Sequence, residues 1–165
     1  MGVSVLAQQQ SKVLSEQHRS FLKLVQQEDV KRLIGDQSLA TRLNESKADH
    51  ALFFIASWCG YCKTEIEYYL KKVGSGSCSR VSFISIDENE ADIKSYLDKN
   101  QKLKTPVYLD SQKKLKKILN LDQVPFVVYI GRDKKYFKTS SGSSKMHSLI
   151  DFIVADGEGR NGACK

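Results

Sequence analysis

The sequence predicts an α/β protein with a central mixed sheet and flanking helices. A continuous apolar run, His50-Ala-Leu-Phe-Phe-Ile-Ala56, has the length and pattern of a strand buried on both faces. Strand and helix patterns then alternate as far as Leu119, which is typical of sheets with parallel central strands. Residues 126–130 and 135–138, joined by Gly131-Arg-Asp-Lys134, have the pattern of an antiparallel hairpin.

The N-terminal part of the chain has helical periodicity. Apolar residues among polar ones predict one or two amphipathic helices between Ser15 and Ile34, ending near Gly35. Asp36 is the expected cap of a short helix that runs to Leu43. The further predicted elements are a helix over 61–73, a flexible loop over 74–79, a strand over 81–86, a helix over 89–100, an extended segment over 106–109, a helix over 111–119 and a closing helix over 144–154. We therefore expect an N-terminal helical extension (1–45), one α/β domain (46–155) and a flexible polar tail (156–165).

Composition excludes several classes of function. With 165 residues, 41% apolar and 27% charged, the chain has the profile of one soluble globular domain. The formal charge of +7 comes from scattered lysines, without a basic stripe interleaved with aromatic residues, so we expect no nucleic-acid partner. No run approaches the roughly 18 apolar residues of a membrane helix. The segment Met1–Ala7 resembles the tail of a secretory signal, although an ordinary disordered N-terminus fits equally well.

The cysteine pair is the strongest chemical signal. Cys59 and Cys62 are three positions apart at the start of a predicted helix, where they can form a disulfide or separate as two thiols with little backbone movement. Cys59 is the expected nucleophile because a helix N-terminus favours a thiolate, and Cys62 is the resolving thiol. Structural zinc needs further ligands, but the other two cysteines and the three histidines are far apart in the sequence. We therefore expect no metal and no cofactor.

A proline forms the second half of the expected site. Pro125 precedes the apolar run Phe126–Ile130, and a strand start alone would explain it. Together with the cysteine pair, Val124-Pro125 resembles the cis-proline loop of thioredoxin-fold enzymes. A cis bond there would place Val124 beside the cysteines, with backbone groups available to an extended substrate.

Over residues 48–155 the chain resembles thioredoxin-like proteins, and among them the exported TlpA/ResA-type thiol:disulfide oxidoreductases. The matching segments are Ala56-Ser-Trp-Cys-Gly-Tyr-Cys-Lys-Thr-Glu65, Ser85-Ile-Asp87, Thr105–Asp110 and Leu119–Pro125. The resemblance implies a thioredoxin fold with an extra N-terminal helix, and with a helix and strand inserted before the cis-proline loop. It also implies a periplasmic or otherwise exported protein, with a cytoplasmic location as the alternative.

Glu65 stands three residues after Cys62, where this group carries an active-site carboxylate. Such an acid exchanges protons with the resolving thiol; the alternative is an exposed helix glutamate. Plain thioredoxin has a buried Asp at the position of Phe53, so a proton relay would run through Glu65. The group usually has Pro where this chain has Tyr61, whereas Gly-Tyr between the cysteines resembles the periplasmic isomerase DsbC. Reductase and isomerase or oxidase functions therefore both stay open.

The leading functional hypothesis is an enzyme that reduces or exchanges protein disulfides through a Cys59 mixed disulfide. Its partners would be protein thiols and disulfides and an upstream thiol electron donor or acceptor, and we expect a monomer. Trp58, Tyr61, Val124 and Pro125 are the expected substrate-binding residues. The alternative from a different class is a non-enzymatic module that uses the same surface to hold a partner's chain. Cys78 and Cys164 are expected to lie outside the catalytic cycle.

Overall fold

Three parallel strands form the centre of the sheet in the computed structural model, which describes residues 5–27, 30–74, 78–100, 102–134, 137–160 and 164. The strands are β1 (Lys31–Ile34), β2 (His50–Ile55), β3 (Val81–Ser85), β4 (Val107–Leu109), β5 (Phe126–Ile130) and β6 (Phe137–Ser141). They lie in the order β1-β4-β3-β2-β5-β6. β1, β5 and β6 run antiparallel to their neighbours, which gives the predicted mixed sheet.

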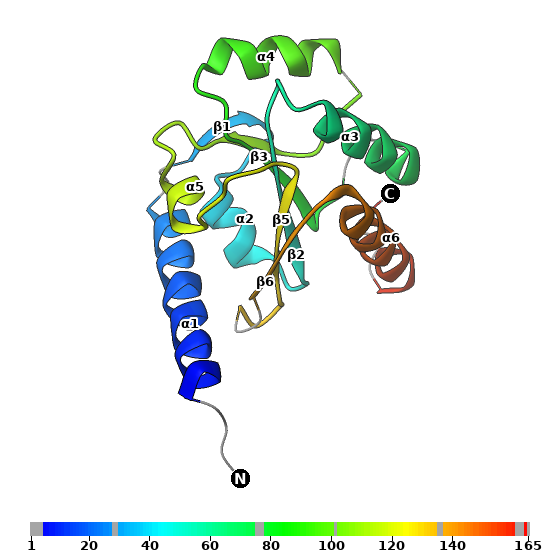
Figure 1. Cartoon of the computed structure of the whole chain (residues 1–165). Coiled ribbons are helices and arrows are strands. Elements are labelled where there is room, and N and C mark those ends of the chain that lie inside the picture. The colour runs from blue at the N-terminus through cyan, green and yellow to red at the C-terminus, as the bar shows by residue number, and fades with distance from the viewer. Residues whose placement is uncertain are drawn as a thin grey trace.

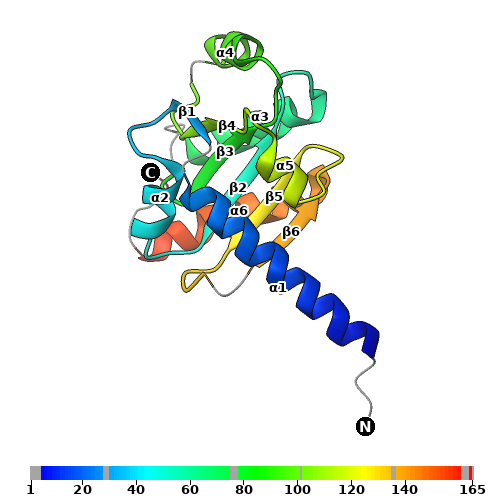
Figure 2. The same ribbon diagram turned by 90° about the vertical axis from the view of Figure 1, so that its left-hand side faces the viewer.

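Helices cover both faces of this sheet (Figure 1). They are α1 (Val5–Gln26), α2 (Leu39–Glu45), α3 (Gly60–Val73), α4 (Glu90–Lys99), α5 (Lys114–Ile118) and α6 (Ser143–Arg160). α3 and α6 pack together on one face, and α1 packs with α2 and α5 on the other. Figure 2 shows α1 and α5 in front of the sheet, with the N-terminal end of α1 extending beyond it. No helix in the described ranges is long and apolar enough to cross a membrane.

The core lies between the sheet and the two helix layers. All six residues of β2 are buried, as the continuous apolar run predicted for a central strand. Phe53 packs against Phe83 of β3, whose ring also meets Tyr69 of α3 edge to face. α1 joins the core through its C-terminal half, where Phe21 and Val25 are fully buried. The inserted α4 and β4 are present as predicted, and β4 adds a strand beside β3.

The N-terminal segment is not entirely helical, contrary to the prediction. The helix predicted to reach Ile34 ends at Gln26, and β1 pairs antiparallel with β4. A four-residue segment with two half-buried apolar side chains is too short for its periodicity to distinguish helix from strand, and the free edge of β4 decides the outcome. α2 is capped by Ser38, whose hydroxyl accepts a hydrogen bond from the Thr41 N–H at 3.1 Å, rather than by Asp36.

The C-terminal segment also differs from its prediction. α6 continues to Arg160 instead of ending at Val154, and Cys164 forms a disulfide with Cys78. The predicted end of the closing helix is therefore too early, whereas the boundary of the domain at residue 155 stays a prediction. Part of the expected loop over 74–79 lies outside the described residues.

Candidate functional site

The cysteine pair lies at the N-terminus of α3, directly after the buried strand β2. Cys59 is the N-cap residue of α3, and Cys62 lies in its first turn. The two form a disulfide with a Cα–Cα distance of 5.2 Å. The Cys62 backbone N–H points at the Cys59 Sγ, 3.1 Å away. Because N–H groups at a helix N-terminus have no intrahelical acceptor, this geometry stabilises negative charge on the Cys59 sulfur.

The two sulfurs differ in accessibility. Cys59 is 7% exposed, whereas Cys62 is completely buried. Trp58 and Tyr61 flank the pair and are 68% and 73% exposed. An incoming group therefore meets two aromatic side chains and the sulfur of Cys59 before it reaches that of Cys62.

The proline loop meets the cysteine pair from the neighbouring strand. β5 pairs with β2 such that Phe54 lies opposite Phe126, and the loop before Phe126 therefore lies where β2 passes into α3. The Val124–Pro125 peptide bond is cis, as the sequence predicted. The carbonyl oxygen of Val124 lies 3.5 Å from the Cys59 Sγ. Val124 is half-buried and Pro125 is buried.

A buried aspartate fixes the loop that carries the cysteines. Asp87, at the carboxyl end of β3, accepts hydrogen bonds from the backbone N–H and the hydroxyl of Ser57. It also accepts one from the Ser85 hydroxyl at 2.6 Å. Asp87 is 1% exposed, so these donors balance the cost of burying its charge. In the sequence, Asp87 is recognisable only as part of a segment that matches the family, because a contact across 30 residues leaves no local signal.

Glu65 is buried between α3 and α6 rather than exposed. Its side chain is 1% exposed, and neither carboxylate oxygen has a hydrogen-bond donor in the described part of the chain. His147 of α6 places its Nε2 atom 3.1 Å from Oε2, within ion-pair distance but without hydrogen-bond alignment. His147 lies far from Glu65 in the sequence, and the packing of α6 on α3 brings the two side chains together.

The other cysteines lie apart from this site. Cys78, which precedes β3, is 1% exposed and is bonded to Cys164 after α6. Within the described ranges, no cluster of three or more His, Cys, Asp or Glu side chains has the arrangement of a metal site.

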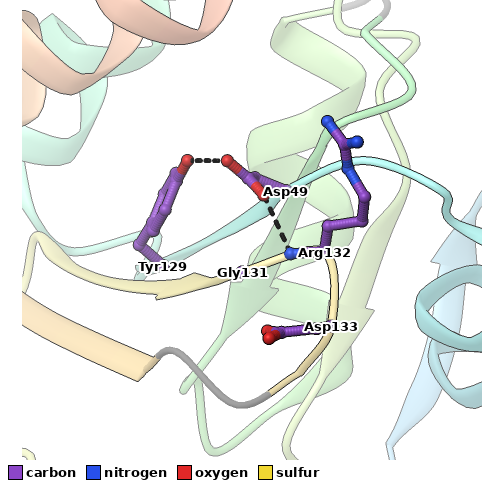
Figure 3. Close-up of a pocket in the computed structure, with 5 residues that line it drawn as sticks. All are labelled: Asp49, Tyr129, Gly131, Arg132 and Asp133. Atoms are coloured by element: carbon purple, nitrogen blue, oxygen red, sulfur yellow. Dashed lines mark hydrogen bonds between the residues drawn. The ribbon is translucent and has the colours of Figure 1, made fainter.

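A separate hollow lies at the opposite end of β2. It is lined by Asp49, Tyr129, Gly131, Arg132 and Asp133 (Figure 3). Asp49 accepts hydrogen bonds from the Tyr129 hydroxyl and from the Arg132 backbone N–H. Although partial burial opposes them, these two hydrogen bonds hold the pKa of Asp49 below its ordinary value. The carboxylate thus closes the β5–β6 connection onto β2, which is a structural role.

Comparisons with known proteins identify a family for this chain. The model of the AhpC/TSA family matches residues 29–139. No curated protein matched the chain.

Similar solved structures have the same fold at low sequence identity. MTB DsbF, in its mixed oxidised and reduced forms, is 16% identical with a TM-score of 0.60, over 76% of this chain and 92% of that chain. StoA from Bacillus subtilis is 21% identical with a TM-score of 0.53, over 66% and 84%. A secreted Mycobacterium tuberculosis disulfide oxidoreductase, homologous to Escherichia coli DsbE, is 14% identical with a TM-score of 0.56, over 78% and 98%. The predicted thioredoxin-like resemblance is confirmed: the chain belongs to the AhpC/TSA family and has the fold of TlpA/ResA-like thiol:disulfide oxidoreductases.

Proposed function

We propose that this protein reduces or exchanges disulfides in protein substrates through a mixed disulfide at Cys59. The observation that carries the proposal is the unequal burial of a bonded cysteine pair at a helix N-terminus, where Cys59 is 7% exposed and Cys62 is completely buried. The Cys59 thiolate attacks a substrate disulfide, forms an S–S bond with one substrate sulfur and releases the other as a thiolate. The Cys62 thiolate then attacks the Cys59 sulfur, which re-forms the internal disulfide and releases the second substrate thiolate.

The surface around Cys59 suits an extended polypeptide. Trp58 and Tyr61 offer large apolar rings at low entropic cost, and aromatic side chains of this kind are common anchors at protein interfaces. The half-buried Val124 lies beside Cys59, and its backbone groups would pair with a substrate strand, a recognition mode that depends little on substrate sequence. The expected substrate is therefore a flexible segment that carries a disulfide, and we expect the protein to act as a monomer.

The second disulfide favours an exported protein. Stable disulfides form in oxidising compartments and are rare where the glutathione and thioredoxin systems keep thiols reduced. The Cys78 end of the Cys78–Cys164 bond is buried. The bond joins the segment before β3 to the segment after α6, far from Cys59–Cys62, which indicates a structural role. A periplasmic or otherwise exported enzyme would need an upstream thiol partner to reset Cys59–Cys62.

Reduction of insulin with dithiothreitol as electron donor tests the proposal. The wild-type protein should accelerate insulin reduction over the donor alone, Cys59→Ser should abolish this acceleration, and Cys62→Ser should accumulate a mixed disulfide with insulin. Binding of insulin without acceleration would indicate the non-enzymatic binding module instead. Activity that persists in Cys59→Ser would refute the assignment of the nucleophile.

The reduction potential of Cys59–Cys62 decides the direction of exchange. A value near that of thioredoxin, about −270 mV, indicates a reductase, and a value near that of DsbA, about −120 mV, indicates an oxidant. Intermediate values near about −180 mV are those of disulfide isomerases.

A further inference from the structure

The buried carboxylate of Glu65 has no hydrogen-bond donor in the described part of the chain. Three acidic side chains there are buried, namely Glu65, Asp87 and Asp110. Asp87 accepts hydrogen bonds from two serines, and Asp110 accepts them from the Leu115 and Lys116 backbone N–H groups. Buried polar groups normally have partners, so the exception at Glu65 calls for an explanation.

His147 is the basic group nearest this carboxylate. Its Nε2 atom lies 3.1 Å from Oε2 of Glu65, and its side chain is 35% exposed where that of Glu65 is 1% exposed. The imidazole therefore connects the buried carboxylate with solvent. Because histidine changes charge near neutral pH, it is suited to carrying protons across such a boundary.

Neighbouring groups hold the imidazole ring in place. It stacks on Tyr68 of α3 with ring centroids 3.9 Å apart and an interplanar angle of 20°. The Tyr68 hydroxyl donates hydrogen bonds to both oxygens of Asp151, which also pairs with Lys72 at 2.9 Å. In the described part of the chain, these contacts place Glu65 and Lys72 of α3 and Asp151 of α6 near His147.

Glu65 also shares a helix face with the resolving cysteine. Cys62 and Glu65 are three residues apart in α3, a spacing that places side chains on the same face, and both are buried. A thiol at 0% exposure cannot exchange protons directly with bulk water, although it must lose one before it attacks Cys59.

We propose that His147 is a positioning residue that relays protons between solvent and Glu65, the carboxylate for which the family resemblance already implies proton exchange with the resolving thiol. This inference rests on the proposed function. In the reductive direction, the Cys62 thiol transfers its proton to the Glu65 carboxylate. The resulting thiolate attacks the Cys59 sulfur, the bond from Cys59 to the substrate breaks, and its electron pair leaves with the substrate sulfur. Glu65 then passes the proton to Nε2 of His147, and the imidazolium releases a proton to solvent.

A chromogenic aromatic disulfide, 5,5′-dithiobis(2-nitrobenzoic acid), separates the two chemical steps in a single turnover of the reduced protein. Attack by Cys59 releases a first coloured thiolate, and attack by Cys62 on the mixed disulfide releases a second. His147→Gln should leave the first step unchanged and slow the second about tenfold, because only the second needs the relay. It should also change the shape of the pH profile of the second step, because the relay would then lack its histidine.

Two further variants test whether His147 acts through Glu65. Glu65→Gln should slow the second step by about a hundredfold, and the double variant with His147→Gln should be no slower than Glu65→Gln alone. His18→Gln is the matched control, since it makes the same substitution on α1, which packs on the other face of the sheet. It should change neither step.

Other outcomes would overturn the relay. The relay is refuted if His147→Gln leaves the rate and the pH profile of the second step unchanged. It is also refuted if this variant slows both steps equally at every pH and lowers the thermal stability. Additive effects in the double variant would show that His147 acts independently of Glu65. If the wild-type protein released no second thiolate and did not reduce insulin, the proposed function itself would fail, and this result is distinct from those of the variants.

Discussion

Removal of the Cys78–Cys164 disulfide should destabilise the protein strongly without impairing its redox activity. The bond joins cysteines 86 residues apart, so it restricts a large part of the unfolded chain. The loop-entropy relation gives about 4.6 kcal/mol for a loop of this length at 25 °C. A domain of this size loses roughly 2 to 4 °C in Tm for each kcal/mol, which predicts a decrease of about 9 to 18 °C.

The assay is thermal unfolding of the oxidised protein, followed by circular dichroism, in the variant that combines Cys78→Ala with Cys164→Ala. Alanine is chosen because Cys78 is 1% exposed, and serine would bury a hydroxyl there. The matched control combines Cys59→Ala with Cys62→Ala. It also removes one fully buried sulfur, but its disulfide spans a sequence separation of only 3. The same relation gives about 1.6 kcal/mol for that loop.

Equal decreases in Tm for the two pairs would refute the loop-entropy reasoning. Alkylation of Cys78 in the folded, untreated protein would refute the disulfide itself. Insulin reduction should persist in the variant that lacks Cys78 and Cys164, because neither sulfur lies near Cys59. A large loss of that activity in a protein still folded at the assay temperature would instead place the second pair in the redox cycle.

Three further predictions concern Cys59, Asp87 and His50. In the reduced protein, iodoacetamide should label Cys59 well before Cys62, since Cys59 is 7% exposed and Cys62 is completely buried; peptide mapping that finds the reverse order would exchange their roles. Asp87→Asn should lower the free energy of unfolding by about 1 to 3 kcal/mol and slow insulin reduction, because the amide NH₂ cannot accept the hydrogen bonds from Ser57 and Ser85. Urea titration measures this, with the exposed Asp98→Asn as a control that should change neither value. Burial, with a smaller effect from nearby arginines, lowers the pKa of His50 to about 3. Below about pH 6.5 the unfolded chain binds a proton at His50 that the native state does not bind. The free energy of unfolding should therefore fall by up to about 5 kcal/mol as the pH drops from about 6.5 to about 3. His50→Asn should flatten this dependence in a pH series of urea titrations, and an unchanged slope would show that other groups cause it.

Local sequence patterns were sufficient to predict the central elements and the redox pair. A strand as apolar as β2 is buried on both faces when it lies in the middle of a sheet. The structure confirms this position for β2. Cys59 and Cys62 interact across three residues of one helix turn, so their spacing alone encodes the contact. Pro125 could be placed beside them only through the family resemblance, because its own sequence context is also that of an ordinary strand start.

Tertiary structure alone decided the remaining features, because they join segments distant in the sequence. The four residues of β1 become a strand through pairing with β4, not through their own periodicity. Glu65 is equally compatible with an exposed or a buried helix position until α6 covers it and brings His147 within 3.1 Å. Cys78 and Cys164 show no local sign of pairing, since a separation of 86 residues leaves their contact to the packing of α6 and the start of β3. A sequence encodes short-range contacts through periodicity and spacing. Long-range contacts form only when the burial of apolar surface packs distant segments into one core.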